Sequence, residues 1–459
     1  MPHTPRTGFG SLQETETDAV TSSVSVFENE IIEKAVTSRK NCIVRPTAIS
    51  DAGPIHVQIV PEGDYWIDPS TLRLNIDLQV KKSLNAKPTE WIDLTTTDAT
   101  TVAPVNLSSK CLIRDIETWM QAKQVSLVAT AAYPVKAYIE TVASYGQDAA
   151  NGHLRCSYYL KDLPGKADDV GNNTSFATRH KYIKKSRMYK VCDTMHTELT
   201  TMDKYILPGI TIDFRFSLNN AGYFLQIAKG GTANDNYKYE IKDFWLSFDR
   251  VTIAKDVYTD IEKKLSAGNK AVYVINRGTI RSKQFPQDQV YAKWQSLYTG
   301  TLPDSVTIAM IDSRAFNGNI DYNIFNFQHF KAESLSLKVN SVSLPSQPLT
   351  MDFPNGDIIR AYRHFFDNIG INNGNSPCLI TFDDFRRGTT LFPFDLTPDK
   401  CSSYHGHVKQ TGNIELDVRF GEALPSTITI LALCNFSDRI YILGPQTNRE
   451  ILINPDVSG

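Results

Sequence analysis

Five segments of the chain alternate apolar and polar residues with a period of two. They run from Leu72 to Val80, Ile210 to Leu218, Tyr239 to Phe248, Leu335 to Val339 and Ile414 to Phe420. Successive side chains of a strand point to opposite faces, so each segment predicts a strand with one buried and one solvent-facing side. Between Ile241 and Phe244 the apolar positions change register once, which predicts a β-bulge. Such strands belong to antiparallel sheets and indicate sandwiches rather than layered α/β folds.

Helical periodicity is confined to a few places. A helix is predicted from Val135 to Tyr145, after Pro134, and another from Ile358 to Ile369, before Gly370. A third, Lys255 to Leu265, lies in the middle of the chain and is our candidate connector between two domains.

The two halves of the chain repeat similar elements in the same order. Three pairs match: Lys123 to Leu127 with Val342 to Leu344, the helix around Tyr138 with that around Tyr362, and Asp213 to Phe216 with Asp417 to Phe420. A preserved order with drifting spacing is expected of two domains of one topology with different loops. The pattern therefore predicts an all-β protein of two tandem β-sandwiches, each of about 200 residues.

Composition supports large cores and argues against a charge-driven function. The 459 residues exceed what one core holds, and 41% of them are hydrophobic and 10% aromatic. With 48 Lys and Arg against 50 Asp and Glu, the net charge of −2 excludes a histone-like DNA wrapper. The chain shows no apolar run long enough to span a membrane and no secretory signal, so we expect a soluble protein. The seven scattered cysteines predict reduced, mostly buried thiols.

Familiar catalytic motifs are absent: no phosphate-binding glycine loop, no H-E-x-x-H and no G-x-S-x-G occurs. His405 and His407 are two residues apart, as metal ligands on one strand would be, but their surroundings indicate a polar loop. The adjacent carboxylates of Asp383 and Asp384 would face opposite ways on an extended segment, so a turn is the preferred interpretation. We therefore predict no catalytic residue, no metal site and no cofactor.

One segment is strongly basic, with no acidic residue between its ends. Its cations are Arg179, Lys181, Lys184, Lys185, Arg187 and Lys190, interleaved with Tyr182 and Tyr189. Clustered cations bind phosphates and interleaved aromatic rings stack on bases, so the segment is a candidate nucleic-acid patch. A solvated loop, or an edge against an acidic surface of a neighbouring subunit, is the alternative. The acidic residues before position 35 are one such partner.

Two loops concentrate aromatic residues. One holds Phe316, Tyr322, Phe325, Phe327 and Phe330, and the other holds Phe382, Phe385, Phe392 and Phe394. So much aromatic surface must be buried, either under loops of the same domain or in contacts between subunits. The sequence leaves both roles open.

Specific sequence motifs are spread over both halves of the chain. The second half carries the clearest of them: Leu302 to Ile308, Ala315 to Gly318, Asn323 to Phe327, Asp352 to Gly356, Arg360 to Tyr362, Thr390 to Asp399 and Leu416 to Phe420. The first half adds Ala103 to Asn106, Tyr133-Pro134, Tyr138 to Thr141 and Tyr158 to Asp162. Together these motifs resemble the hexon-like major capsid proteins of adintoviruses and the related Polinton (Maverick) elements. The likeness spans roughly residues 50 to 443 in order, and the run from Thr390 to Asp399 is the most specific.

The resemblance implies a double jelly roll, meaning two eight-stranded sandwiches side by side. The expected organisation is a flexible N-terminal arm (1–40), a first jelly roll (41–254), a connector helix (255–268), a second jelly roll (269–443) and a C-terminal tail (444–459). Three such chains would form a pseudo-hexameric capsomer that tiles an icosahedral shell around a DNA genome. The implied partners are further copies of the chain, penton or minor capsid proteins and, weakly, packaged DNA. The implied location is the virion, and no enzymatic activity is expected.

Three other hypotheses remain at this point. A minor capsid protein at the vertices is disfavoured because such proteins are usually single jelly rolls. A tandem-sandwich carbohydrate-binding protein would use the aromatic loops, and a cupin-like metalloenzyme would be centred on His405 and His407.

Overall fold

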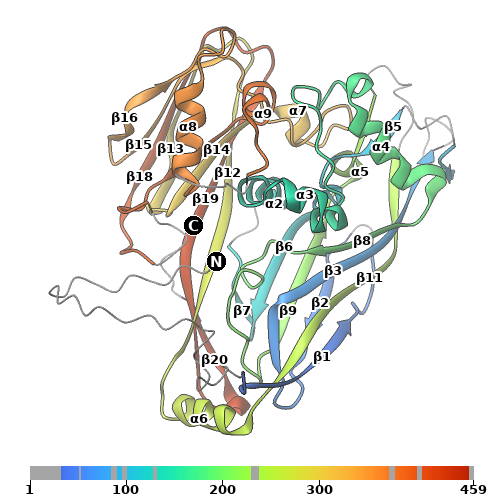
Figure 1. Ribbon diagram of the computed structural model, residues 1–459, viewed down its shortest axis with the longest axis vertical. Coiled ribbons are helices and arrows are strands. Elements are labelled where there is room, and N and C mark those ends of the chain that lie inside the picture. Colours follow the sequence, from blue (N-terminus) through green and yellow to red (C-terminus); the bar gives the residue numbers. More distant parts are fainter. Residues whose placement is uncertain are drawn as a thin grey trace, which may run out of the picture.

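The computed structural model describes residues 33–50, 53–83, 90–95, 101–127, 132–228, 237–371, 378–400 and 406–453. Residues 1–32, which make up most of the predicted N-terminal arm, lie outside these ranges, as do residues 454–459 of the predicted tail. The described chain folds mainly into antiparallel sheets, with helices in the connections (Figure 1).

The first half forms a sandwich of two sheets. One sheet has the order β1-β11-β3, with β8 and β4 both paired to β3, and the other has the order β2-β9-β6-β7. The strands are β1 (Val36–Val44), β2 (Ile55–Ile59), β3 (Trp66–Ser83), β4 (Trp91–Asp93), β6 (Ile113–Met120), β7 (Lys123–Gln124), β8 (Tyr189–Thr194), β9 (Ile212–Leu218) and β11 (Tyr237–Ile253). A separate small pair joins β5 (Val102–Pro104) to β10 (Leu225–Ile227).

The second half repeats this architecture. Its sheets have the orders β12-β19-β14-β17 and β13-β18-β15-β16, and β20 is added to β19. The strands are β12 (Ala271–Phe285), β13 (Tyr291–Thr301), β14 (Ser305–Asp312), β15 (Ala332–Val339), β16 (Val342–Thr350), β17 (Leu391–Asp395), β18 (Thr411–Phe420), β19 (Ile428–Leu443) and β20 (Glu450–Ile453).

The two halves correspond strand by strand. In chain order, β1, β2, β3, β6, β7, β8, β9 and β11 occupy the places that β12 to β19 occupy in the second half. These eight equivalent strands in each half make two sandwiches of one topology, a double jelly roll, as expected, with β4 and β20 added at the sheets. The repeats noticed in the sequence fall on equivalent elements, since Phe214 lies in β9 and Val418 in β18.

The alternating patterns predict the strands and their buried faces correctly. Leu74, Ile76 and Leu78 of β3 are buried, as are Phe214 and Phe216 of β9. The register of β11 against β3 shifts at the predicted place, after Ile241. One detail differs: the opposite face of β3 is half-buried rather than open, and Asn75 donates from Nδ2 to Ser247 Oγ at 3.0 Å.

The helices lie in the long connections. They are α1 (Ser108–Cys111), α2 (Tyr133–Ser144), α3 (Gln147–Asn151), α4 (Thr174–Ile183), α5 (Ala221–Phe224), α6 (Lys255–Ser266), α7 (Ser313–Phe316), α8 (Ile359–Asn368) and α9 (Phe382–Arg387), with short 3₁₀ turns η2 (His153–Ser157), η3 (Val170–Asn172), η4 (Lys184–Ser186) and η5 (Gln446–Asn448). The predicted helices correspond to α2, α8 and α6. In none of the helices of the described ranges is there an apolar stretch of the length that a bilayer requires.

The domain boundaries stay predictions, although several elements bear on them. The helix α6 links β11 of the first half to β12 of the second, and Figure 1 shows it at one end of the molecule. The strand β1 begins at Val36, inside the segment predicted as an arm, and β20 pairs with β19 inside the segment predicted as a tail.

Candidate functional site

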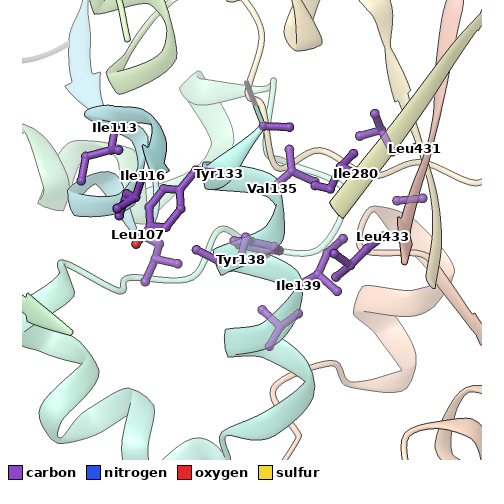
Figure 2. Close-up of a cluster of buried hydrophobic side chains, with 14 of the residues drawn as sticks. Leu107, Ile113, Ile116, Tyr133, Val135, Tyr138, Ile139, Ile280, Leu431 and Leu433 are labelled. Atoms are coloured by element: carbon purple, nitrogen blue, oxygen red, sulfur yellow. The ribbon is translucent and has the colours of Figure 1, made fainter. Parts of the chain in front are cut away.

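The helix α2 lies at the junction of the two halves and contacts both (Figure 1). Its buried side chains Val135, Tyr138 and Ile139 belong to one hydrophobic cluster that continues from the first sandwich into the second. Figure 2 shows them between Leu107, Ile113 and Ile116 on one side and Ile280, Leu431 and Leu433 on the other. Burial on both sides makes the two sandwiches one packing unit with a fixed relative orientation.

Aromatic rings from the two halves meet at this junction. The ring of Tyr138 stacks on Phe325 with centroids 4.2 Å apart, and Phe327 packs edge-on against it at 5.8 Å. Phe385, Phe392 and Phe394 are buried as well, and Phe316, Tyr322 and Phe330 are partly buried against the core. Of the aromatic residues singled out in the sequence, Phe382 is the exposed one, at 37%. These loops are therefore used chiefly inside the chain.

Polar contacts cross the junction beside the aromatic rings. Asp168 of the first half accepts hydrogen bonds from Asn323 N and Asn326 Nδ2, each at 2.7 Å. Lys161 forms an ion pair with Asp384 and donates to the carbonyl of Leu379 at 2.8 Å. These contacts satisfy polar groups that the junction would otherwise bury at a cost.

The interpretation of Asp383 and Asp384 as a turn was wrong. Both lie in α9, where Thr381 and Asp384 form a reciprocal capping box. Asp384 is 2% exposed and paired with Lys161, so it caps the helix and holds a cation. The sequence missed this role because the partner Lys161 lies more than 200 residues away.

The backbones of the halves approach closely at one place. A Cβ added to Gly222 would lie 2.1 Å from the carbonyl oxygen of Gly318. Gly318 itself has a φ of +76° and faces the ring of Tyr223, whose hydroxyl donates to Phe316 O at 2.9 Å. Glycine is needed here for the close approach at one position and the left-handed backbone at the other.

A cluster of buried charges lies next to α2. Lys110 pairs with Asp193 at 2.9 Å, and their side chains are 4% and 8% exposed. Burial opposes the ionisation of Asp193, yet its pKa is lowered because Lys110 and the hydroxyls of Ser109 and Ser157 outweigh burial. This cluster fixes α1 and η2 against the edge strand β8.

A second charged group lies at a cavity between the halves, which is lined by its members Lys136, Glu140 and His196. His196 Nδ1 lies 2.7 Å from Glu140 of α2, and Lys136 is 3.9 Å from Glu198. Burial, followed by the charge of Lys110, lowers the pKa of His196. The cavity has a volume of about 500 Å³ and is lined from the second half by Asn276 and Asp304, among others. The sequence analysis did not single out these residues. A signal was present, because Lys136 and Glu140 are spaced four apart and so lie on the same side of a largely apolar helix.

The basic segment divides into one buried cation and five exposed ones. Arg179 is 0% exposed, contrary to its place in the predicted patch. It pairs with Asp162 at 2.7 Å and donates to the carbonyls of Pro104 and Leu160 at 2.7 and 2.9 Å. A buried guanidinium with these partners supports the fold. Lys181, Lys184, Lys185, Arg187 and Lys190 are exposed on α4, η4 and the start of β8, where the patch stays a prediction.

The candidate metal pair His405 and His407 lies partly outside the described residues, so its assignment stays a prediction. His405 lies outside the described residues, and His407 Nε2 is 2.7 Å from Asp399 Oδ1. Across the described ranges, no three His, Cys, Asp or Glu side chains are placed to share an ion.

The prediction of mostly buried thiols was wrong in part. Cys111 and Cys434 are buried, and Cys42 and Cys378 are half-buried. Cys156 and Cys192 are exposed, and all six of these thiols are free. Cys401 lies outside the described residues.

Comparison with known sequences gives no matching family model but does give a distant relative. The uncharacterised protein F54H12.2 of Caenorhabditis elegans is 20% identical over 333 residues, covering 72% of this chain and 77% of the relative.

Solved structures that resemble this chain are those of viral capsids. A chain of the Sputnik virophage matches with a TM-score of 0.63 and 12% identity over 99% of this chain and 94% of its own. The major capsid protein of faustovirus matches with a TM-score of 0.58 and 7% identity, over 90% of this chain and 92% of its own. That of mavirus matches with a TM-score of 0.55 and 12% identity, over 98% and 97%. The part of the chain that the structure describes therefore has the double jelly-roll fold of these viral proteins.

Proposed function

We propose that the chain is a major capsid protein that assembles as a homotrimer into a pseudo-hexameric capsomer of an icosahedral shell. The observation that carries the proposal is the shared double jelly-roll fold, which extends over 99% of the chain and 94% of the virophage protein. A match of this extent leaves little room for an additional catalytic domain in the sequence given. The role is structural and non-enzymatic.

The junction supports this role physically. Two sandwiches of one topology, held in a fixed orientation by α2 and a continuous core, make each chain a pair of similar blocks. Three chains around a threefold axis then supply six similar blocks, which suits sixfold packing positions in a shell. A flexible link between the sandwiches would not define such an outline.

The finer assignments belong to the same proposal. The motifs from Leu302 to Phe420 support a member of the adintovirus and Polinton group, with penton or minor capsid proteins as partners and the virion as location. The exposed cations from Lys181 to Lys190 are proposed to contact a neighbouring subunit or, weakly, packaged DNA.

Imaging of the assembled protein tests the proposal. The full chain, purified after expression without other viral proteins, is examined by negative-stain electron microscopy over a range of salt concentrations and pH. We expect particles with hexagonal outlines, alone or in sheets and closed shells. Pentagonal particles would instead indicate a vertex protein, and single elongated particles under every condition would contradict assembly.

A further inference from the structure

Two exposed thiols of the first half lie on segments that contact each other, η2 and β8. Cys156 is in η2 and Cys192 is in the edge strand β8. Both line the same cavity, of about 270 Å³, together with His153 and Arg73. The fold and the proposed assembly assign no role to this pair.

The two segments that carry these cysteines are held together by their neighbouring residues. Ser157 donates from Oγ to Asp193 Oδ1 at 2.5 Å, so the residue after each cysteine is bonded to the other segment. The hydroxyl of Tyr158 donates to Lys190 O at 2.6 Å, and its ring stacks on that of Tyr189 with centroids 4.0 Å apart. These contacts keep η2 against β8 whether or not the thiols are joined.

Cys156 is also close enough to Cys192 to act on the pKa of the Cys192 thiol. The pKa of Cys192 is raised, mainly by partial burial and next by Cys156, while Arg73 opposes the rise. Because the thiolate is the attacking species, exchange at Cys192 is expected to be faster above neutral pH.

We propose that Cys156 and Cys192 are a redox pair that forms a reversible intrachain disulfide. With a small-molecule disulfide such as oxidised glutathione as oxidant, one thiolate attacks the glutathione disulfide and releases one glutathione thiolate. The second cysteine thiolate then attacks the mixed disulfide and releases the other. One S–S bond forms within the protein, one breaks in glutathione, and the two thiol protons pass to the released thiolates or to water.

The disulfide would close a loop that carries the basic segment. Joining positions 156 and 192 encloses η3, α4 and η4, and with them all six cations from Arg179 to Lys190. A cross-link restricts the unfolded chain more strongly as the loop grows, so oxidation is expected to stabilise this region. The reduced protein is already held by the contacts of Ser157 and Tyr158, so it folds without the bond.

A disulfide fits the observed side chains better than a metal ion does. Within the described ranges, which include this cavity, no three His, Cys, Asp or Glu side chains are placed to hold an ion. Two thiols suffice for a disulfide, whereas a structural zinc site needs four ligands.

Peptide mapping of the purified full chain tests the proposal. The protein is incubated with oxidised glutathione at pH 8, alkylated and digested with trypsin without reduction. We expect a disulfide-linked pair of peptides, Cys156 to Lys161 joined to Val191 to Lys204, which separates on adding dithiothreitol. We also expect oxidation to raise the Tm by about 2 to 6 °C.

Single substitutions distinguish this pair from other thiols. Cys156→Ser and Cys192→Ser should each abolish the linked peptides and the oxidation-dependent Tm rise, while Cys42→Ser, a half-buried thiol of β1, should retain both. Glutathione attached to both cysteines without a cross-link, or disulfide-linked dimers, would overturn the proposal. The readout uses unassembled protein, so it stands or fails separately from the capsid function.

Discussion

The phenol ring of Tyr138 stacks on the ring of Phe325 with an interplanar angle of 13°, and the two residues come from different sandwiches. Tyr138 is 5% exposed and Phe325 is 4% exposed, so the contact lies inside the junction. Their stack links α2 of the first half to the aromatic loop of the second. Substitutions at this stack therefore test how the relative orientation of the two sandwiches is held.

Replacing Tyr138 with alanine should destabilise the whole chain. The substitution removes a buried ring and its stack on Phe325, and we expect the free energy of unfolding to fall by about 3 to 5 kcal/mol. Denaturant titration measures this, with Tyr138→Phe as the matched control because it keeps the ring. Equal losses in the two variants would show that the ring stack contributes little.

The pair of Lys110 and Asp193 should behave as a buried ion pair. Lys110→Met leaves the carboxylate of Asp193 buried without its cation, so we expect a loss of about 3 to 5 kcal/mol in unfolding free energy. Lys40→Met is the control, since Lys40 pairs with Glu62 at 3.5 Å on the surface and should change stability by less than about 1 kcal/mol. A neutral Lys110→Met variant would refute the buried pairing.

Asp115 should make stability depend on pH in the opposite sense to a salt-bridged acid. Burial first, and the charges of Glu117 and Glu198 next, raise its pKa to about 6, above the value near 4 of an unfolded chain. Between pH 4 and pH 6 the folded state therefore binds more protons than the unfolded state, and this group's contribution to stability falls as pH rises.

Substitution isolates that contribution from those of other groups. Asp115→Asn removes the charge, and we expect it to be more stable than the original chain by about 1 to 2 kcal/mol at pH 7, allowing for partial solvent screening. The difference should vanish towards about pH 3, below the unfolded-state pKa, where Asp115 is protonated in both states. Unfolding curves at several pH values measure it, and a difference that grows towards low pH would contradict the assignment.

The cations of the basic segment should separate into two classes. Arg179→Met removes the partner of Asp162 and two carbonyl contacts, so we expect a loss of about 3 to 5 kcal/mol. Lys185→Met, at an exposed position, should change stability by no more than about 0.5 kcal/mol. Equal Tm values for the two variants would contradict a stabilising role of the buried Arg179 guanidinium.

Much of the fold follows from local patterns. The alternation in β3, β9 and β18 predicts their buried faces because a strand side chain can point only to one face or the other. The repeat between the halves predicts two similar sandwiches, and the register change after Ile241 predicts a bulge that the structure contains. These features depend on a few neighbouring residues, so the sequence alone reveals them.

The roles of the buried charged residues could not be predicted in this way. Arg179 lies in a run of surface cations, yet it is buried because Pro104 and Asp162 are brought to it by the fold. Asp384 resembles a turn residue until Lys161 is placed beside it. The partners of such groups are far away in sequence, and no local pattern encodes them. The same holds for the stack of Tyr138 on Phe325.

The native mass of the purified full chain tests the proposed capsid function most directly. One chain has a mass of 51.5 kDa, so a homotrimer should measure about 155 kDa by light scattering or mass photometry, or appear in larger multiples of the trimer. A protein that stays at the mass of one chain across all salt concentrations and pH values tried would contradict the account.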